Sequence, residues 1–371
     1  MKKIACLLLM ITFVSLVSSC KADIHPIKES GTNGILYPIY KNGKYGYIDS
    51  NGEIKIKPQF DDAQDFYEGL AVVYVNGLAG YINRNGEFIL DPQYDYAGGF
   101  YNGIADYGVS RGEDPYKPFN YIIGYINTEG KILKEPIYKF IRGFSESLAQ
   151  VTTNERYGYI DTEFNMVIEE KFVSSGDFHE GLAFARVNNL EPYGYIDSSG
   201  EFVIEPIFYS AGNFQNGYAP VMYRKEELQE LFWGYINKEG EFAIKPKYYG
   251  AVEYSEGLFG VGIKCEDGIT RFGYIDIDEN IIIEPIFEEV EPFSEGLAAV
   301  KLPDPKNPEQ SKWGYINKNG DLVIQPQFDN VEPFKDGIAR VRFLDYRRMN
   351  MAEGYINKDG EYIWEPTWYS P

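Results

Sequence analysis

The sequence predicts an all-β fold built as a tandem array of nine repeats, each a three-stranded β-meander. A Gly-Tyr-Ile triplet recurs nine times, at intervals of 34 to 44 residues. Apolar and polar residues alternate around the triplet, which is typical of half-buried strands. A turn signal follows, because Gly stands six residues after the triplet Gly in seven of the nine copies. The triplets begin at Gly46, Gly80, Gly124, Gly158, Gly194, Gly234, Gly273, Gly314 and Gly354.

The first expected strand of each unit precedes the triplet, as in residues 69–75. Ala71, Val73 and Val75 fall on one face of this segment, which indicates a strand with one buried side. Residues 34–40 occupy the same place in the first unit, so we expect them to form its first strand.

The second strand holds the triplet, and Asp or Asn follows its Ile in every unit. Asx side chains bond back to a turn, and Gly adopts positive φ without strain. Two units carry Phe164 or Glu279 in place of that Gly, and each is followed by Asn (Asn165, Asn280), which tolerates the left-handed conformation. One Asx per unit does not supply the several oxygens that a calcium site needs within one loop. The pattern therefore predicts turns and no metal.

The third strand reaches Pro in eight of the nine units, as at Pro58, and we expect pairing to end there because Pro has no N–H. Two residues later every unit has an aromatic residue, such as Phe60. A second aromatic residue, such as Phe66, precedes the next first strand. Since both recur at one place per unit, they favour an aromatic core ladder between stacked units over platforms for sugars.

The pattern W/Y-G-Y-I-[DN], x-x-G, x-x-I-x-P-x-[FY] and F-x-x-G-L-A resembles the bacterial WG-repeat family over residues 34–371. Trp itself precedes the Gly only at Trp233 and Trp313. The resemblance implies a β-rich repeat scaffold with no established reaction.

Two arrangements of the nine units are compatible with this pattern: an open, superhelical β-solenoid and a closed, propeller-like ring. Nine units of three strands exceed the usual four to eight four-stranded blades of a propeller. In addition, neither end of the chain visibly completes a blade. The sequence therefore favours the open array, with the closed ring as the alternative.

The N-terminus predicts export. In residues 1–19 two lysines precede an apolar run that is too short to remain as a membrane span, so this segment is a signal peptide that is removed. The stretch LVSSC, ending at Cys20, resembles the lipobox of bacterial lipoproteins, which implies that Cys20 is diacylated. The alternative is a plain signal peptide whose cleavage site falls near a Cys. Residues 20–33 are polar and suit a flexible tether, and residues 34–371 form a single repeat domain.

Composition limits the partners. With 35 basic and 56 acidic residues, the net charge of −21 disfavours nucleic acid and anionic lipid headgroups. Membrane contact is therefore expected only through the N-terminal lipid. Cys265 is the one cysteine left after Cys6 leaves with the signal peptide and Cys20 is lipidated, so no disulfide framework is expected.

No sequence motif indicates catalysis. The chain has no G-x-S-x-G, P-loop, H-E-x-x-H or Cys/His cluster, so we predict no catalytic residue, metal or cofactor. The leading hypothesis is a non-catalytic, lipid-anchored binding or scaffolding protein of the bacterial cell envelope. The alternative is a carbohydrate-active enzyme that uses paired carboxylates, for which the chain has many acids.

Insertions predict where binding occurs. The spacing from each triplet Gly to the next first strand is 23 residues at all eight junctions, so length varies only between the first and second strands. Those hairpin tips should emerge on one edge of the array, where repeat proteins usually bind. Exposed aromatic residues with Arg suit a protein or glycan partner, although weakly constrained surface loops are the alternative explanation. The candidate binding residues are Tyr116, Phe119, Tyr121, Arg224, Tyr346, Arg347 and Arg348.

Overall fold

A computed structural model describes residues 34–110, 121–225, 230–304 and 307–369. The predicted signal peptide, Cys20 and the tether lie outside these residues, as do Tyr116 and Phe119. The described residues form strands and turns, and they include no helix long and apolar enough to cross a membrane.

The strands form nine antiparallel sheets, which we call blades 1 to 9 in chain order. Blade 1 has three strands, β1 (Tyr37–Lys41), β2 (Lys44–Ile48) and β3 (Ile54–Phe60). Blade 2 has β4 (Asp62–Tyr67), β5 (Leu70–Val75), β6 (Leu78–Asn83) and β7 (Phe88–Tyr94). Blade 3 has β8 (Tyr96–Ala97), β9 (Ile104–Ser110), β10 (Tyr121–Asn127) and β11 (Ile132–Tyr138). Blade 4 has β12 (Phe140–Ile141), β13 (Leu148–Thr152), β14 (Tyr157–Asp161) and β15 (Met166–Phe172).

Blades 5 to 9 repeat the four-stranded plan. Blade 5 has β16 (Ser174–Ser175), β17 (Ala183–Arg186), β18 (Tyr193–Ile196) and β19 (Phe202–Phe208). Blade 6 has β20 (Ser210–Ala211), β21 (Ala219–Lys225), β22 (Glu230–Ile236) and β23 (Phe242–Tyr248). Blade 7 has β24 (Gly250–Ala251), β25 (Phe259–Lys264), β26 (Thr270–Ile275) and β27 (Ile281–Phe287). Blade 8 has β28 (Glu289–Val290), β29 (Leu297–Asp304), β30 (Asn307–Asn317) and β31 (Leu322–Phe328). Blade 9 has β32 (Asn330–Val331), β33 (Ile338–Asp345), β34 (Asn350–Asn357) and β35 (Tyr362–Trp368).

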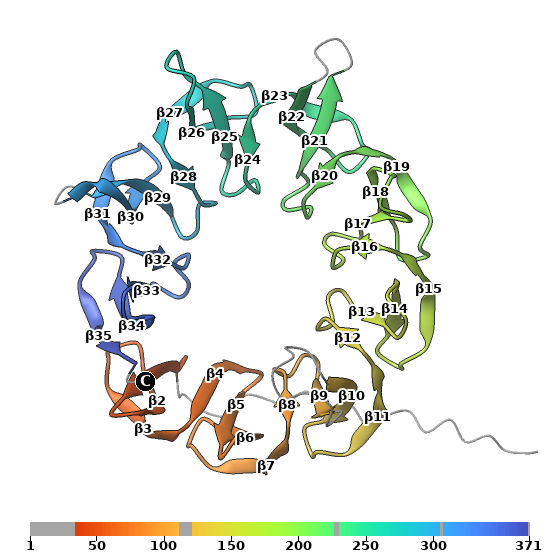
Figure 1. The fold of residues 1–371 in the computed structure, drawn as a ribbon, viewed down its shortest axis with the longest axis vertical. Coiled ribbons are helices and arrows are strands. Elements are labelled where there is room, and N and C mark those ends of the chain that lie inside the picture. Colours follow the sequence, from red (N-terminus) through yellow and green to blue (C-terminus); the bar gives the residue numbers. More distant parts are fainter. Residues whose placement is uncertain (1–33, 111–120, 226–229, 305–306, 370–371) are drawn as a thin grey trace, which may run out of the picture.

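The nine blades close into a ring, a nine-bladed β-propeller (Figure 1). The leading strand of each four-stranded blade faces the ring centre, and the last strand lies at the outer rim. The prediction that favoured an open array is therefore wrong, and the alternative is the observed fold. The sequence analysis missed the leading strand because in blades 3 to 9 it is only two residues long, too short to show alternation. That strand gives blades 2 to 9 the four strands of a propeller blade.

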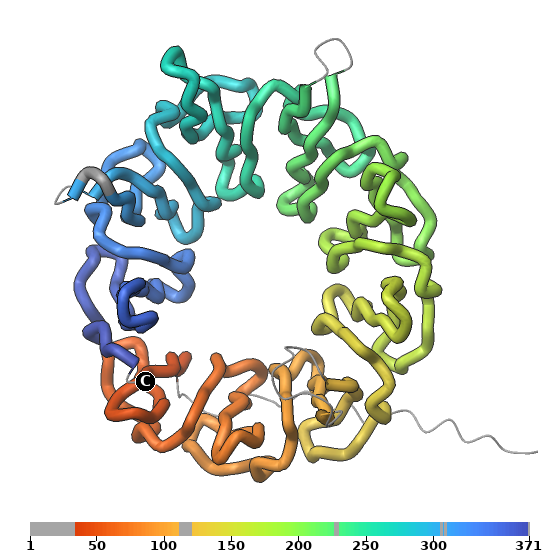
Figure 2. Tube along the Cα trace, viewed as in Figure 1, coloured from red at the N-terminus to blue at the C-terminus, as the bar shows by residue number. Residues whose placement is uncertain are grey.

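The two ends of the described chain meet in the ring. Figure 2 shows β1, at the red end of the colour scale, beside β35, at the blue end. The Tyr355 hydroxyl donates to the Pro38 carbonyl oxygen at 2.8 Å, and the Thr367 hydroxyl donates to the Tyr40 carbonyl oxygen. The first strand starts at Tyr37, so the expected strand over residues 34–40 is shifted towards the triplet.

The predicted Asx turns are present. Asp49 Oδ1 accepts hydrogen bonds from the N–H groups of Asn51 and Glu53, at 2.9 and 3.0 Å. The two units without the turn Gly differ from expectation, because Phe164 and Glu279 themselves adopt positive φ, 64° and 63°. The turn geometry thus determines the backbone at that position, even where the residue is poorly suited to it.

The triplet Gly is required by a close backbone approach. A Cβ on Gly273 would lie 2.4 Å from the Ile283 carbonyl oxygen, and a similar clash occurs at every triplet Gly. The pairing register shifts at this place in each blade, which brings the two strands together. The third strand of each unit also continues through its Pro, as Ile54–Phe60 does through Pro58. The expectation that Pro ends the strand was wrong because this strand is the outer edge of the blade, where no partner needs its N–H.

The core lies between neighbouring blades, as the aromatic ladder predicted. The ring of Tyr274, 1% exposed, packs at 4.9 Å on the ring of Phe293 from the next blade. Its hydroxyl donates to the Glu291 carbonyl oxygen in that blade at 2.7 Å. Phe287 is 1% exposed, whereas its counterpart in the last unit, Trp368, is 50% exposed. The ladder is therefore complete between blades and ends at the last unit.

A carboxylate also links successive blades. The Glu295 carboxylate accepts hydrogen bonds from the backbone N–H groups of Asp336 and Gly337, at 2.6 and 2.9 Å, and contacts Lys358 Nζ at 3.0 Å. Glu256 makes the corresponding contacts with the Gly296 N–H. We call this contact the carboxylate staple. It ties the loop before the second strand of one blade to the same loop of the next.

Candidate functional site

The hairpin tips that the sequence singled out lie on blades spread around the ring. Tyr121 begins β10 in blade 3, Arg224 lies near the end of β21 in blade 6, and residues 346–348 form the turn between β33 and β34 in blade 9. Two blades separate each of these from the next (Figure 1). The described candidates therefore do not form one site.

Tyr121 packs on its own blade and the next one. Its ring stacks on that of Tyr96, with centroids 5.9 Å apart. Together with Ile123, Lys139 and Phe140 these rings border a hollow of about 200 Å³. The size of this hollow suits one or two side chains of a partner and is below that of most ligand sites.

The tip of blade 9 is exposed. Tyr346 is 73% exposed. Asp345 Oδ1 accepts a hydrogen bond from the Arg347 N–H at 3.0 Å, and its other oxygen lies 3.7 Å from Arg348 Nε. These contacts shape the turn, in which Met349 is also exposed, at 90%.

Arg224 belongs to a larger group of residues. Its Nη1 donates to the Tyr209 hydroxyl at 3.3 Å, and it pairs across the hairpin with Leu231. Tyr209 is 49% exposed and Leu231 is 41% exposed.

A second group of contacts joins the same hairpin to blade 7. The rings of Phe232 and Tyr249 lie 5.3 Å apart, and Tyr249 is 42% exposed. Lys225 Nζ lies 5.3 Å from the Phe232 ring, and Lys264 Nζ lies 5.4 Å from the Tyr249 ring. We define the blade 6–7 patch as Tyr209, Arg224, Lys225, Leu231, Phe232, Tyr249 and Lys264.

Tyr209 and Tyr249 stand where other units carry a structural Asp. Each directly follows the aromatic residue at the end of a third strand, as do Asp61, Asp95 and Asp329 in other units. Those three carboxylates accept hydrogen bonds from backbone N–H groups of the next hairpin, at 2.6, 2.8 and 2.9 Å respectively. The two tyrosines replace this bond with exposed ring surface, so the ring fold does not require them.

A larger hollow, of about 620 Å³, adjoins the patch. Tyr249 and Lys264 line it together with Lys247, Cys265 and Glu279. The Glu279 carboxylate, which pairs with Lys247, raises the pKa of that ammonium group. The volume is within the range of binding pockets, about 300–1,000 Å³. The arrangement offers a basic, aromatic surface with a recess beside it.

Sequence reasoning found Arg224 and missed Tyr209, Tyr249 and Lys264. The signal that it could have used is the position directly after the third-strand aromatic residue, which holds Asp in three units and Tyr in three others, at 209, 249 and 369. It relied on loop length instead, and neither tyrosine lies in an insertion.

The fold defines the protein as a nine-bladed β-propeller of repeated units, and the repeats define its family. A family model described as "WG containing repeat" matches eight segments, residues 45–78, 80–107, 123–157, 157–190, 193–225, 233–263, 272–302 and 313–345. The chain belongs to this family, as its motifs predicted. No curated protein matches it.

A solved structure resembles the ring in fold. The crystal structure of a eukaryotic initiation factor is similar with a TM-score of 0.63 and 11% identity, over 91% of this chain and 98% of that chain. A quinonprotein alcohol dehydrogenase-like protein from Bacteroides thetaiotaomicron has a TM-score of 0.34 and 10% identity, over 91% of this chain and 76% of that one. At this identity the first likeness shows the fold alone.

Proposed function

We propose that this protein is a non-catalytic binding protein of the bacterial cell envelope, anchored by a lipid on Cys20, which holds a partner at the blade 6–7 patch. One observation carries the patch: Tyr209 and Tyr249 are exposed at a position where other units use Asp to tie the hairpin. Tyr and Arg are among the residue types that are enriched in protein interfaces and in their hot spots.

The chemistry of the patch favours an acidic segment of a protein partner. Three cations, Arg224, Lys225 and Lys264, gather there on a chain with a net charge of −21. Lys264 also lies over the ring of Tyr249, so it covers a ring face that a sugar would stack on, while Phe232, under Lys225, is only 6% exposed. Complementary charge would attract an acidic partner and orient it.

The patch can be tested by replacing its two exposed tyrosines with the residue that other units of the chain have at the same position. The double variant Tyr209→Asp, Tyr249→Asp installs the residue found at Asp61 and Asp329, so it should fold. The immobilised full chain would be cross-linked to envelope extracts, with bound proteins quantified by mass spectrometry and a glycan array run in parallel. The matched control is Tyr346→Asp, which changes an exposed tyrosine outside the patch.

We expect the double variant to lose at least tenfold of the captured partner and the control to lose none. Equal capture by the double variant would place the partner elsewhere. Glycan binding without protein capture would replace the protein partner by a polysaccharide. Turnover of a glycan would establish the enzyme alternative instead.

The anchor has its own test. The LVSSC stretch motivates acylation of Cys20, and Cys20→Ala should move the protein out of the detergent phase or leave it unprocessed. A variant that matures and partitions with membranes like the parent would remove the lipid from the proposal and leave the patch untouched.

A further inference from the structure

The carboxylate staple recurs unevenly around the ring. At five junctions the Glu carboxylate of one blade accepts a hydrogen bond from a backbone N–H of the next blade. These residues are Glu68, Glu146, Glu180, Glu256 and Glu295, at junctions 2/3, 4/5, 5/6, 7/8 and 8/9 respectively. The staples therefore link the blades into three bodies, which consist of blades 2–3, blades 4–6 and blades 7–9.

The staple is interrupted at junctions 3/4 and 6/7, where Asn102 and Asn216 hold the position of the Glu. Neither Asn side chain makes a hydrogen bond with another described residue. The backbone does not require Asn, because the five staple Glu residues adopt φ of 48° to 55° and the two Asn residues adopt 50°. Hydrogen bonds to a charged group are about twice as strong as neutral ones, so both junctions lack a strong link that the five stapled junctions have.

Hydroxyl contacts change at the same two junctions. At three stapled junctions the residue before the Glu is Ser, and its hydroxyl donates to a Phe carbonyl oxygen of the next blade, as Ser255 does to Phe293. Tyr101 and Gln215 hold this position at junctions 3/4 and 6/7. The Tyr of the triplet donates to a backbone carbonyl of the neighbouring blade in every unit but one. The exception is Tyr125 at junction 3/4, whose buried hydroxyl has no partner among the described residues.

A hollow accompanies each of these two junctions. The hollow of about 200 Å³ lies between blades 3 and 4, because Tyr121 and Phe140 border it from the two blades. The hollow of about 620 Å³ lies between blades 6 and 7, where Tyr248 and Lys264 line it. Blades 6 and 7 remain packed elsewhere, since the Tyr218 ring lies 5.1 Å from that of Tyr254. Open volume beside a retained ring contact is the geometry of a hinge, because the blades can turn without losing all their packing.

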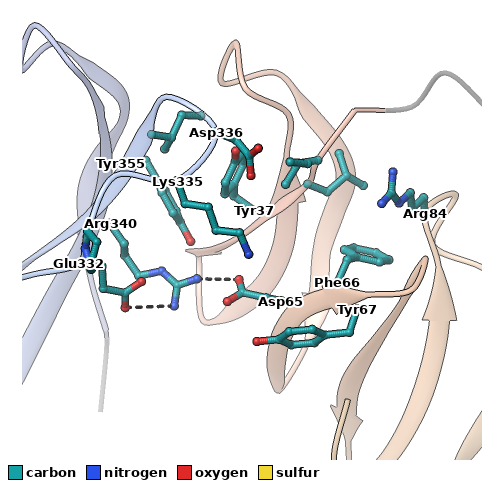
Figure 3. Close-up of a pocket in the computed structure, with 14 residues that line it drawn as sticks. Tyr37, Asp65, Phe66, Tyr67, Arg84, Glu332, Lys335, Asp336, Arg340 and Tyr355 are labelled. Atoms are coloured by element: carbon teal, nitrogen blue, oxygen red, sulfur yellow. Dashed lines mark hydrogen bonds and ion pairs between the residues drawn. The ribbon is translucent and has the colours of Figure 1, made fainter. Parts of the chain in front are cut away.

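A closed ring of three bodies bends only if the place where its ends meet can also give. Figure 3 shows this closure, in which Arg340 of blade 9 reaches Asp65 of blade 2 at 2.7 Å. Both side chains line a hollow of about 170 Å³, together with Tyr37 of blade 1. Asp336 holds the position of the staple Glu, and its carboxylate accepts no hydrogen bond from a described residue. The closure therefore depends on side-chain contacts and supplies a third joint.

We propose that junctions 3/4 and 6/7 are hinges between the three stapled bodies, and that opening the 6/7 hinge separates the two halves of the blade 6–7 patch. Arg224 and Phe232 belong to blade 6, whereas Tyr249 and Lys264 belong to blade 7. The rings of Phe232 and Tyr249 meet across the junction, with centroids 5.3 Å apart. Opening the hinge breaks this contact and divides the surface. The link to the patch rests on the proposed function, and the hinges themselves do not.

Distances between pairs of spin labels measure the 6/7 hinge. In the full chain with its native cysteines changed to Ser, labels on Leu190→Cys of blade 5 and Met349→Cys of blade 9 lie in the two bodies that meet at this hinge. The control pair, Ile269→Cys of blade 7 with Met349→Cys, lies within one body. All three side chains are exposed. We expect the first distance distribution to be at least twofold wider than the second, and equal widths would overturn the proposal.

A staple installed at the hinge tests its cause. Asn216→Glu places a carboxylate before the backbone N–H groups of Glu256 and Gly257, as Glu295 is placed before those of Asp336 and Gly337. This variant should narrow the first distribution to the width of the control pair. Asn216→Gln has the same length without the charge and should leave the distribution wide. Narrowing by neither variant, or equally by both, would overturn the assignment of the hinge to the missing carboxylate.

The 3/4 hinge is measured in the same way. Labels on Leu78→Cys of blade 2 and Leu190→Cys of blade 5 lie on either side of it. Asn102→Glu should narrow their distance distribution, and Asn102→Gln should not. An unchanged width in Asn102→Glu would remove this hinge from the proposal.

Partner capture then tests the link between the hinge and the patch. A staple at junction 6/7 holds the two blades in the arrangement in which the patch is whole, so Asn216→Glu should raise capture at least threefold. Unchanged capture, despite a narrowed distance distribution, would overturn this link. If the parent captures no partner while the label distances behave as expected, the proposed function fails and the hinges stand.

Discussion

The junction between blades 7 and 8 and the closure between blades 9 and 1 join the same kind of blade by different contacts. At the first, the Tyr274 ring packs on Phe293, and the Ser255 hydroxyl donates to the Phe293 carbonyl oxygen at 2.5 Å. At the closure, the Tyr355 ring meets Tyr37 at 5.5 Å, in the place of a phenylalanine.

Charged side chains also differ between the two junctions. The Glu256 staple joins blades 7 and 8 through a backbone N–H, whereas Arg340 reaches Asp65 of blade 2 at 2.7 Å. The ordinary junction therefore depends on backbone groups and buried rings that every unit supplies. The closure depends on particular side chains, and it should be the weaker of the two.

The largest expected effect comes from removing an aromatic side chain at the ordinary junction. Phe293→Ala deletes a ring that is 2% exposed and should destabilise the protein by about 3–5 kcal/mol. Tyr37→Ala, at the closure, should cost about 2 kcal/mol or less, because that ring is only partly buried. Urea denaturation of both variants measures the difference. Equal losses would show that the closure is as tightly packed as the rest of the ring.

A second test adds a methyl group at the backbone. Gly273→Ala places a Cβ 2.4 Å from the Ile283 carbonyl oxygen, so overpacking should cost about 3 kcal/mol. Gly34→Ala is the matched control near the closure, where a Cβ would meet no atom within 4 Å. Thermal melts should separate the two clearly, and a tolerant Gly273→Ala would mean that the triplet Gly has another role.

The closure ion pair should have a smaller effect. Arg340 is 16% exposed at its side chain and Asp65 is 44% exposed, so Arg340→Met should cost about 1–2 kcal/mol, below the cost of breaking a wholly buried pair. Arg142→Met removes an exposed pair with Asp177 in the ordinary part of the ring and should cost under about 0.5 kcal/mol. Similar values for the two variants would remove the special role of Arg340.

Acid sensitivity should arise at the Glu295 staple. The ammonium of Lys358 and the N–H groups of Gly337 and Asp336 lower the pKa of Glu295. Because this pKa is lower in the folded protein, the stabilisation is complete above the unfolded value of about 4.3 and is lost as pH falls through the folded value. Glu295→Gln should therefore flatten the loss of stability between about pH 5 and pH 3. Denaturation series at the two pH values check this, and an unchanged slope would contradict it.

The smallest effect is a gain. Asp336→Glu lengthens the side chain at the closure to that of Glu295, so that it could reach the N–H groups of Gly34 and Ile35 as a staple does. One exposed hydrogen bond to a carboxylate should add about 0.5–1 kcal/mol. Thermal melts measure this gain, with Asp336→Asn as the comparison. The two variants separate the effect of the longer side chain from the effect of the charge.

Much of the fold was predictable because it is local. The turn at Asp49, the strand alternation at Ala71 and Val73, and the aromatic residues at Phe60 and Phe66 each follow from near neighbours in sequence. Their agreement over nine units fixed the all-β repeat and the core between units.

Ring closure and the candidate site were harder to predict because they depend on distant partners. A two-residue strand such as Tyr96–Ala97 carries no periodic signal, and its pairing with Tyr107 and Gly108 appears only in space. The sign of φ at Phe164 follows from the turn that surrounds it and not from that residue's preference. Tyr209 was missed because it stands out only when its position is compared with the Asp residues that other units have there.

The offset between sequence unit and blade has a consequence for how such rings change in size. Each unit supplies the last three strands of one blade and the leading strand of the next, as β9 to β12 do across blades 3 and 4. Duplicating or losing a stretch of one repeat length therefore leaves the number of strands in every remaining sheet unchanged, wherever the cut falls within the repeat. A recombination breakpoint can therefore lie at any position within the repeat. The number of blades is then limited only by whether the last blade still contacts the first.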